Sequence, residues 1–480
     1  MKLAAGARWI FVLLAGAILF YQLEVPPVVG LADNGDFGKV IGRFDLIGRV
    51  HSTYAYADAT YEFHPETHWV SGFNSSEIPL AQAAVWLNSL LSKDGNFSIG
   101  CIGAVHGALF LMALWLFAPL LADARPGLRW AMYGLILFVY CDMMYVSSLN
   151  SFYMDEPAYL FLLLTAVCYL RVLRWGRTRD AVLLIVCAFL LVTAKTQHAL
   201  LGFWIALLLL LAAKALRPIR PRIWYVASGL LVVAGGLMAW KAQPADYAAF
   251  SLYGVTFETI LPHSKDVPRT LAELGLDDSY RSRIGKKAYS SDSGMFDPAF
   301  HDRFTRQYSV AKLAIFYLRR PDVAYQTMRA ALSEAGDQRS FGNFDRSAGM
   351  PWQSHAFAWW STIKRHFFSR RGSVLFFAFL ALSALLGFLL WLQRRSLPGG
   401  AAPAGLCLIA GAFTEMGLAT LCDSMDIVRH AMIFLALFDM IALVCAYLLL
   451  RLVLGRKPNA PPHPGGGVFD DAAPSASGRT

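Results

Sequence analysis

Residues 181–213 read AVLLIVCAFLLVTAKTQHALLGFWIALLLLLAA, which is two apolar runs joined by the polar sequence Lys195-Thr-Gln-His198. This stretch could form one very long helix or two shorter ones. Basic residues flank it on both sides, and short basic segments beside apolar runs stay on the cytoplasmic side of a membrane. Because both flanks share one side, the chain must cross an even number of times, so residues 195–198 are expected to form a tight turn on the outer side. The flanking residues are Arg171, Arg174, Arg177 and Arg179 before the stretch, and Lys214, Arg217, Arg220 and Arg222 after it.

The same pattern of apolar runs and basic connections extends over the whole chain of 480 residues, of which 56% are hydrophobic and 16% are charged. A soluble protein of this size needs more charge to cover its surface, so the composition indicates a membrane protein. About ten apolar blocks approach the ~20 residues that span a bilayer. They cover 9–23, 99–121, 130–146, 157–172, 181–194, 199–213, 224–240, 374–392, 404–421 and 431–450. We therefore expect an all-α polytopic membrane protein with about ten transmembrane helices.

Charge beside these blocks orients the chain. Lys2 and Arg8 place the N-terminus in the cytoplasm, and the later connections on that side are also basic. The first apolar run lacks a small-x-small cleavage site, so we expect a retained helix and not a cleaved signal. Residues 78–91 have the apolar spacing of a helix that lies on the membrane surface. The predicted regions are an N-terminal transmembrane catalytic module 1–240 with a first extracytoplasmic loop 24–98, a large extracytoplasmic loop 241–373, C-terminal transmembrane helices 374–457 and a disordered cytoplasmic tail 458–480.

Charge and cysteine content exclude several classes of function. The net charge of +10 comes mostly from Lys and Arg beside the apolar blocks, which is a topology signal and not the footprint of a nucleic-acid-binding protein. The seven cysteines lie mostly inside apolar blocks and form no CxxC, so neither a disulfide framework nor a zinc site is indicated. His64 and His68 have an i, i+4 spacing, but Pro65 and the lack of a third ligand argue against a metal site. No metal ligands are assigned, and the use of a divalent metal stays open.

Polar residues gather in four connections that the predicted topology places on the same outer face. The connections are Asp33-Asn-Gly-Asp36-Phe37, Asn150-Ser-Phe-Tyr-Met-Asp155-Glu156-Pro157, Lys195-Thr-Gln-His198 and Asp423-Ser-Met-Asp426-Ile-Val-Arg429-His430. Carboxylates suit a general base, while Lys, Arg and His suit a lipid-linked phosphate held at the interface. The four connections together therefore indicate a site at which an acid and a phosphate-binding group meet.

Each connection also has a purely structural explanation. Asp-Asn-Gly-Asp is a common turn composition, and Asp155-Glu156-Pro157 suits the start of a helix. Lys195 could extend to the headgroups, and Arg429 and His430 could be interfacial anchors. Two further acids, Glu415 and Asp439, lie inside apolar blocks, where they serve either function or helix packing. The shared side and the order of the four connections favour the functional interpretation.

That order resembles the GT-C superfamily of polyprenyl-phosphate-sugar-dependent glycosyltransferases. Members of the family carry an acid in the first outer loop, often as an Asp-Glu pair before an aromatic residue, and Asp33-Asn34-Gly35-Asp36-Phe37 occupies that place. Asp155-Glu156-Pro157 looks like the acid and proline at the start of the family's fourth helix. Thr193-Ala-Lys195-Thr looks like a Thr-Lys-Gly step, and Arg429-His430 looks like an Arg-Tyr pair. The chain departs from the pattern at Asn34, Thr196 and His430, where the family has an acid, a glycine and a tyrosine.

A narrower resemblance involves the second large loop. The sequences Tyr253-Gly-Val-Thr-Phe, Leu271-Ala-Glu-Leu-Gly-Leu276, Phe316-Tyr-Leu-Arg-Arg-Pro321 and Phe341-Gly-Asn343 are similar to bacterial surface-glycan hexosyltransferases of the S-layer type. The resemblance implies a multi-pass protein of the bacterial inner membrane with a site that faces the periplasm or the cell exterior.

The resemblance to the GT-C superfamily implies an inverting transfer of a hexose or pentose to a glycan or lipid-linked acceptor. Asp33 would be the base, with Asp36 as the close second. Substrate-binding residues would be Lys195, His198, Arg429 and His430 at the phosphate, and Asp155 or Glu156 at the sugar or acceptor hydroxyls. The implied partners are a polyprenyl-phosphate-linked sugar, the acceptor and membrane lipids, and not nucleic acid.

Other functions fit parts of the sequence. A transporter or flippase of lipid-linked glycan could use Glu415 and Asp439 as a relay, but the sequence has no inverted repeat and no paired broken helices. A glycan polymerase or ligase would differ only in its acceptor. A non-catalytic scaffold would not need acids clustered at the starts of loops.

Overall fold

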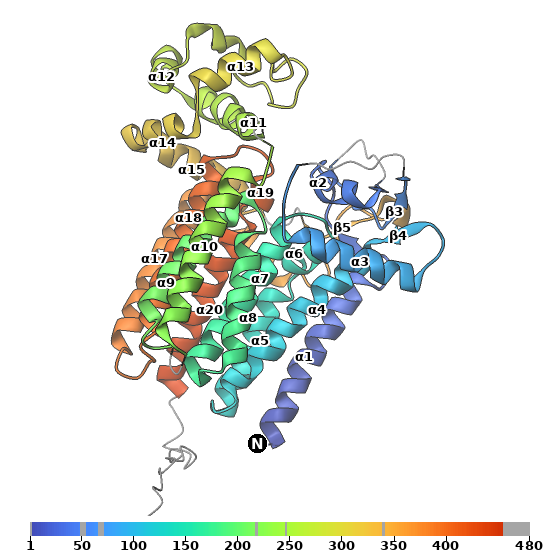
Figure 1. Ribbon diagram of the computed structural model, residues 1–480, viewed down its shortest axis with the longest axis vertical. Coiled ribbons are helices and arrows are strands. Elements are labelled where there is room, and N and C mark those ends of the chain that lie inside the picture. The colour runs from blue at the N-terminus through green and yellow to red at the C-terminus, as the bar shows by residue number, and fades with distance from the viewer. Residues whose placement is uncertain are drawn as a thin grey trace, which may run out of the picture.

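The computed structural model describes residues 2–48, 54–65, 72–216, 219–244, 247–337 and 341–454. Long, roughly parallel helices form a bundle, and a smaller helical region stands on one end of it (Figure 1). The N-terminus and the end of the last helix both lie at the opposite end of the bundle. We call the end that carries the smaller helical region the far end.

The helices of the bundle follow the apolar blocks of the sequence. They are α1 (Lys2–Leu23), α4 (Ile99–Phe117), α5 (Pro126–Tyr140), α7 (Asp155–Trp175), α8 (Thr178–Val192), α9 (Leu201–Ala212), α10 (Pro221–Lys241), α17 (Gly372–Leu392), α18 (Ala401–Leu421) and α20 (Met432–Leu454). Within the described ranges, 7 helices are long and apolar enough to cross a membrane, or up to 8 if the bent pair Pro126–Tyr140 and Met143–Leu149 is one span. The predicted all-α polytopic membrane fold is therefore confirmed.

The two remaining helices of the bundle, α8 and α9, are too short to count as membrane spans by length, so fewer than the expected ten or so spans are found. Helix α8 has 15 residues, and the apolar helix Thr196–Ala212, which joins the 3-10 helix η5 (Thr196–Leu200) to α9, is also shorter than a full span. At ~1.5 Å per residue, each is shorter than the ~30 Å hydrocarbon core of a bilayer. The chain turns back at residues 193–196, at the far end, so the stretch 181–213 is a helical hairpin as predicted.

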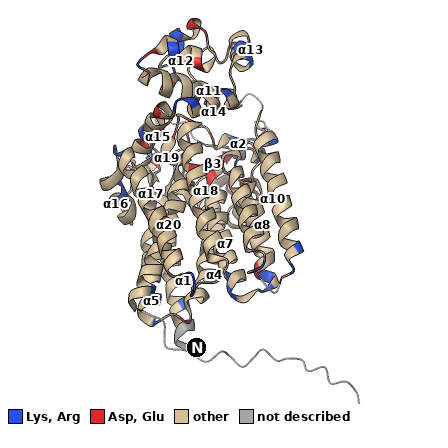
Figure 2. Cartoon of the chain, turned by 90° about the vertical axis from the view of Figure 1, so that its left-hand side faces the viewer, with Lys and Arg blue, Asp and Glu red and all other residues tan. Residues whose placement is uncertain are grey.

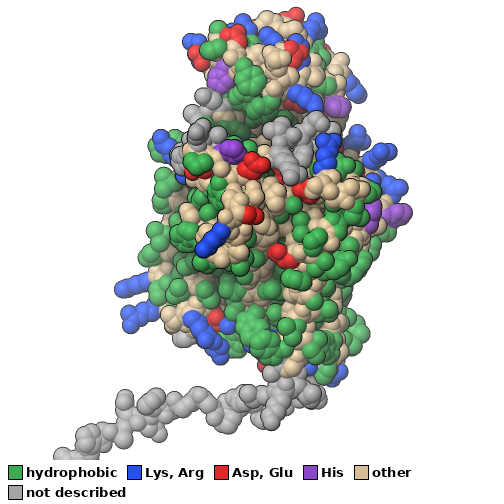
Figure 3. All heavy atoms as spheres, turned by 90° about the vertical axis from the view of Figure 1, so that its right-hand side faces the viewer, with side chains coloured by type: hydrophobic (Ala, Val, Ile, Leu, Met, Phe, Trp, Pro, Cys, Tyr) green, Lys and Arg blue, Asp and Glu red, His purple; other side chains and the backbone are tan. Residues whose placement is uncertain are grey.

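Two inner helices and a lipid-facing rim organise the bundle. Helices α7 and α20 are the most enclosed of the candidate spans, while α1, α10 and α17 expose much of their apolar surface. Hydrophobic side chains cover the middle of the face shown in Figure 3. Lys and Arg gather at the end of the bundle beside the N-terminus and again on the far-end region, with few charges along the helices between them (Figure 2). This distribution is typical of a protein surrounded by lipid over its middle.

The first large connection forms a small sheet and a surface helix at the far end. Strands β2 (Leu46–Ile47), β3 (Thr60–Phe63) and β4 (Asn96–Ser98) pair antiparallel in that order. The connection also holds the short helices α2 (Gly38–Ile41) and η1 (Gly42–Phe44) and the helix α3 (Glu77–Leu91). Trp86, Leu90 and Leu91 of α3 are strongly exposed, as expected for a helix that lies on the membrane surface.

The second large connection divides into parts with different packing. Its first part has a hydrophobic core of its own, around Tyr253, Phe257, Tyr280 and Phe304. Its elements are α11 (Tyr247–Gly254), the π-helix η6 (Val255–Ile260), η7 (Leu261–His263), α12 (Val267–Leu274), η8 (Asp278–Arg283), α13 (Pro298–Gln307) and α14 (Val310–Arg319). Its second part, α15 (Pro321–Ala335), η10 (Arg346–Ala348) and α16 (Trp359–Phe368), packs back on the bundle, with α15 against α17 and α18.

A two-residue pairing joins the two connections. Strand β1 (Val29–Gly30) pairs antiparallel with β5 (Asn343–Phe344). In addition, Asn343 Oδ1 accepts a hydrogen bond from the Ala32 amide at 3.2 Å. The segment that leads into Asp33 is therefore held from both sides before it reaches the candidate site.

Candidate functional site

Four short segments deliver the polar residues of the far end. The 33–37 turn follows α1, Asp155 begins α7, Lys195 and His198 lie between α8 and α9, and α19 (Ile427–His430) lies between α18 and α20. Acidic residues suit the first turn of α7, where the helix dipole favours negative charge. The predicted convergence of the four connections at one end of the bundle is therefore present in the structure.

Arg429 is the centre of this group. Its Nε donates to Asp426 at 2.7 Å, its Nη1 to Asp155 at 2.8 Å and its Nη2 to Asp36 at 2.7 Å. The guanidinium also lies 4.2 Å from the ring centroid of Tyr153. Burial alone would lower the pKa of Arg429, but the carboxylates of Asp426, Asp36 and Asp155 outweigh it and hold the pKa well above its usual value. Residues from three separate segments thus meet at one fixed positive charge.

Asp155 carries the network into the bundle. Lys195 Nζ donates to its two oxygens at 2.8 and 3.0 Å, and His198 Nε2 lies 3.1 Å from Oδ1. The other ring nitrogen of His198 lies 2.9 Å from Glu415 Oε2. Glu415, one of the two acids predicted inside apolar blocks, is therefore joined to the site through His198.

The two acids of the first turn have different surroundings. Asp33 Oδ1 accepts hydrogen bonds from the amides of Gly35 at 2.8 Å and Phe37 at 3.1 Å, and a φ of +100° at Gly35 closes the turn. Asp36 instead pairs with Lys39 at 2.6 Å and with Arg429. Asp33 therefore shapes the backbone of the turn. Asp36 belongs to the group of ion pairs around Arg429, Asp155 and Asp426, which we call the ion-pair cluster.

These surroundings separate the two pKa values. The Asp33 side chain reaches solvent, but protein atoms surround it on most sides, and this desolvation raises its pKa against the opposing hydrogen bonds from Phe37 and Gly35. Burial would also raise the pKa of Asp36, but Arg429 and Lys39 outweigh it and hold the pKa well below the usual value. Of the two, Asp33 is therefore the better proton acceptor, and Asp36 is the more firmly ionised carboxylate.

His430 orients the central arginine. Arg429 Nη2 lies 3.1 Å from His430 Nε2 and can only donate to it. The other ring nitrogen, Nδ1, then carries the proton that faces Asp423 Oδ2 at 3.2 Å. Although burial would raise the pKa of Asp423, its pairing with His430 lowers it. His430 thus links the Arg429 guanidinium to Asp423.

Glu156 is not brought into this cluster. Neither of its buried carboxylate oxygens bonds a residue of the cluster. Near it lie His106 of α4 and Glu77 of α3, whose side chains are 3.2 Å apart and fully buried. Successive residues of a helix point ~100° apart, so Asp155 and Glu156 face different sides of α7. The predicted role of Glu156 in holding a sugar or acceptor hydroxyl has no support in this placement.

Several residues of the site were missed by sequence reasoning. Lys39 Nζ contacts Asp36 and also donates to the Tyr247 hydroxyl at 2.8 Å. Its i, i+3 spacing from Asp36 was a usable signal. Tyr54 and Asn34 each donate to Asp426 Oδ2 at 3.0 Å. The amide of Asn34 can donate to this carboxylate, whereas a carboxylate at position 34 would repel it.

The second buried acid, Asp439, has a different partner. Lys364 Nζ of α16 and the Tyr145 hydroxyl, from α6 (Met143–Val146), both donate to Asp439 Oδ2 at 2.6 Å. The side chains of Lys364 and Asp439 are 1% and 0% exposed. This contact ties α16 to α20 and supports the packing interpretation of Asp439.

Metal ligands are not gathered in the part of the chain that the structure describes, where no group of three or more His, Cys, Asp or Glu could hold an ion. His64 pairs with Glu62 at 3.1 Å, while His68 lies outside the described residues.

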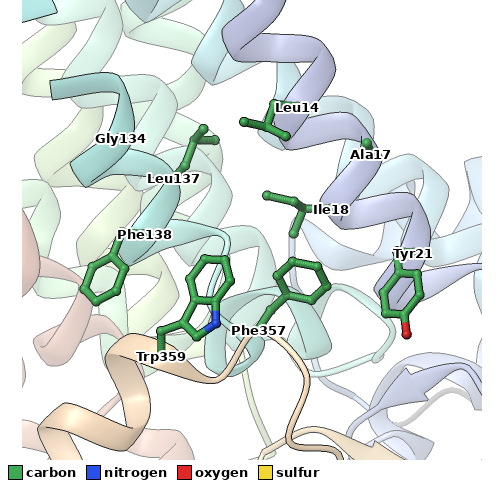
Figure 4. Close-up of a pocket in the computed structure, with 9 residues that line it drawn as sticks. All are labelled: Leu14, Ala17, Ile18, Tyr21, Gly134, Leu137, Phe138, Phe357 and Trp359. Atoms are coloured by element: carbon green, nitrogen blue, oxygen red, sulfur yellow. The ribbon is translucent and has the colours of Figure 1, made fainter. Parts of the chain in front are cut away.

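A groove of about 600 Å³ lies elsewhere, between α1, α5 and the chain before α16. Figure 4 shows its apolar lining, which includes Leu14, Tyr21, Phe138, Phe357 and Trp359. The groove holds no charged side chain, so it is a feature of the lipid-facing surface and not of the ion-pair cluster.

Comparison with known proteins gives one clear result. No curated protein and no solved structure matches the chain. A family model described as the YfdI N-terminal transmembrane domain matches residues 1–459, and the chain therefore belongs to this family of transmembrane domains.

Proposed function

We propose that this protein is an integral membrane glycosyltransferase that transfers a sugar from a polyprenyl-phosphate carrier to a glycan or lipid-linked acceptor. One observation carries the proposal. A solvent-accessible acid, Asp33, lies beside a cluster of Arg429, Lys195 and Lys39 at one end of a membrane bundle. A phosphate at a membrane surface and an acceptor hydroxyl in water would meet at such a place.

The chemistry assigned to these residues is an inverting substitution. The acceptor oxygen forms a bond to the anomeric carbon, and the bond from that carbon to the phosphate oxygen breaks. The polyprenyl phosphate leaves with the electron pair, stabilised by Arg429 and Lys195. Asp33 takes the proton of the acceptor hydroxyl, which suits a carboxylate whose pKa is raised.

The proposed orientation places the far end outside the cytoplasm, in the inner membrane of a bacterium. The argument for it is the run of basic residues at the opposite end of the bundle, where Arg125, Arg174, Arg177 and Arg222 lie in or beside the connections. Polyprenyl-linked sugars would then be used on the side of the membrane where surface glycans are assembled.

Membranes that contain the full chain, incubated with radiolabelled polyprenyl-phosphate sugars, test the proposal. We expect label to move from the lipid to an acceptor in wild-type membranes and not in membranes with Asp33→Asn and Asp36→Asn combined. Transfer by the double variant at the wild-type rate would reject the mechanism.

The contacts of the two buried acids give less support to the transporter alternative. It requires Glu415 and Asp439 to exchange protons, yet Glu415 is bonded to His198 and Asp439 to Lys364 and Tyr145. A glycan polymerase or ligase would use the same site with another acceptor, so it is a variant of the proposal.

A further inference from the structure

The Arg429 side chain is 4% exposed, and each of its three nitrogens already donates to a carboxylate. Its Nε, Nη1 and Nη2 are bonded to Asp426, Asp155 and Asp36, all at 2.7–2.8 Å. Because so little of the side chain is exposed, a phosphate that bonds the guanidinium has to take the place of one of these three carboxylates. The question is therefore which of the three carboxylates can leave Arg429 when the donor binds.

Two of the three carboxylates are firmly held. Asp155 is 2% exposed and also bonds Lys195 and His198. Asp426 is 14% exposed, accepts hydrogen bonds from Tyr54 and Asn34, and lies on the same short segment as Arg429 itself. Moving either one would break several other bonds.

Asp36 is the carboxylate that can leave. Its side chain is 22% exposed, the highest of the three, and it follows Gly35, whose positive φ marks a glycine-dependent turn. Besides Arg429 its charged contact is Lys39, which is also held by the Tyr247 hydroxyl, so the Asp36 carboxylate can leave Arg429 and keep its bond to Lys39.

Charge balance points the same way. Three carboxylates, Asp36, Asp155 and Asp426, face three cations, Lys39, Lys195 and Arg429. An incoming phosphate adds at least one negative charge to a balanced and largely buried cluster, which is costly unless a carboxylate withdraws toward water.

We infer that the Asp36 carboxylate occupies the place of the donor phosphate in the free protein, and that donor binding displaces it from Arg429. The inference rests on the proposed function and deepens it. Displacement frees a carboxylate beside Asp33 only after the donor has bound. The freed Asp36 can then hold the acceptor hydroxyl while Asp33 takes its proton, so donor binding would precede activation of the acceptor.

The test measures binding and not turnover. The full chain in detergent micelles is titrated with farnesyl phosphate, a short isoprenyl phosphate that carries no sugar. Asp36→Asn keeps the shape but removes the competing charge, so the affinity should rise roughly tenfold or more. Asp33→Asn is the matched control, because it makes the same substitution three residues away on a carboxylate that does not contact Arg429, and its affinity should stay at the wild-type value. Asp36→Ser serves if Asp36→Asn does not fold.

The outcomes separate this inference from the proposed function. Unchanged or weaker binding by Asp36→Asn or Asp36→Ser overturns the displacement, even if the protein transfers sugar. An equal rise in affinity for Asp33→Asn also overturns it, since a general loss of negative charge would then explain the effect. A rise confined to the Asp36 variants supports the displacement, and a failure of sugar transfer in the same preparation would then reject the transferase alone.

Discussion

Arg429 donates hydrogen bonds to carboxylates from the first outer turn, the start of α7 and its own short helix. Removing Arg429 would therefore leave all three carboxylates without this partner. Truncating one partner of a buried charged pair typically costs about 2–5 kcal/mol. We expect Arg429→Ala to lower kcat/KM for the lipid donor by at least roughly tenfold. Arg429→Lys should restore only part of it, because a point charge cannot match the planar fork.

A donor titration of membranes with equal amounts of each variant checks this prediction. Thermal unfolding of the purified variants is the control, since unpaired carboxylates could also destabilise the fold. Wild-type transfer by a folded Arg429→Ala would make Arg429 an interfacial anchor.

Asp33 and Asp36 should respond differently to the same substitution. An amide keeps size and most hydrogen bonds but removes basicity, and a general base is typically worth about 10² to 10⁴ in rate. We expect Asp33→Asn to lower kcat by about that factor and Asp36→Asn to lower it less. Single-turnover assays with saturating donor measure this, and the reverse order would reassign the base to Asp36.

The pH dependence follows from the same pair. The base works when it is deprotonated, and desolvation raises the pKa of Asp33 above the ordinary value of about 3.9. Activity should therefore be lost on acidification at a pH above that of an ordinary aspartate. Asp36, whose pKa Arg429 and Lys39 lower, stays ionised through that range. A wild-type profile that is flat down to the ordinary aspartate range would exclude Asp33 as the base.

At the scale of elements, the long helices could be predicted because apolar runs and basic flanks are local properties of the sequence. The hairpin at 181–213 is the clearest example, since charge on both sides required a return. Contacts between segments that are distant in the sequence could not be predicted in this way. The bond between Arg429 and Asp36 joins residues 393 apart, and no local pattern specifies it. The predicted topology placed these residues on one face, and the structure supplied their pairing.

Helix α16 shows the same limit and gives a testable consequence. Lys364 and Asp439 are 75 residues apart, and no local sequence pattern pairs them. Breaking a buried ion pair by removing one partner typically costs about 3–5 kcal/mol, whereas replacing both by apolar residues is often neutral. We expect Lys364→Met to lower the thermal stability of the detergent-solubilised protein, and Lys364→Met with Asp439→Leu to recover most of it. A single variant as stable as the wild type would show that the pair does not hold α16 on α20.

At the scale of the whole molecule, the proposal depends on one orientation. The start of α1 and the end of α20 lie at one end of the bundle, and the ion-pair cluster lies at the other. Basic connections at the end with the termini predict that this end is cytoplasmic. A reporter fused at Arg177, between α7 and α8, should therefore read cytoplasmic, and one at Ser290, between η8 and α13, should read extracytoplasmic. Reporters of opposite preference, one active only outside the cytoplasm and one only inside, should give complementary signals at each position. A cytoplasmic signal at Ser290 would place the Arg429 cluster where extracytoplasmic acceptors cannot reach it, and the proposed reaction would have to be abandoned even if the cluster itself binds phosphate.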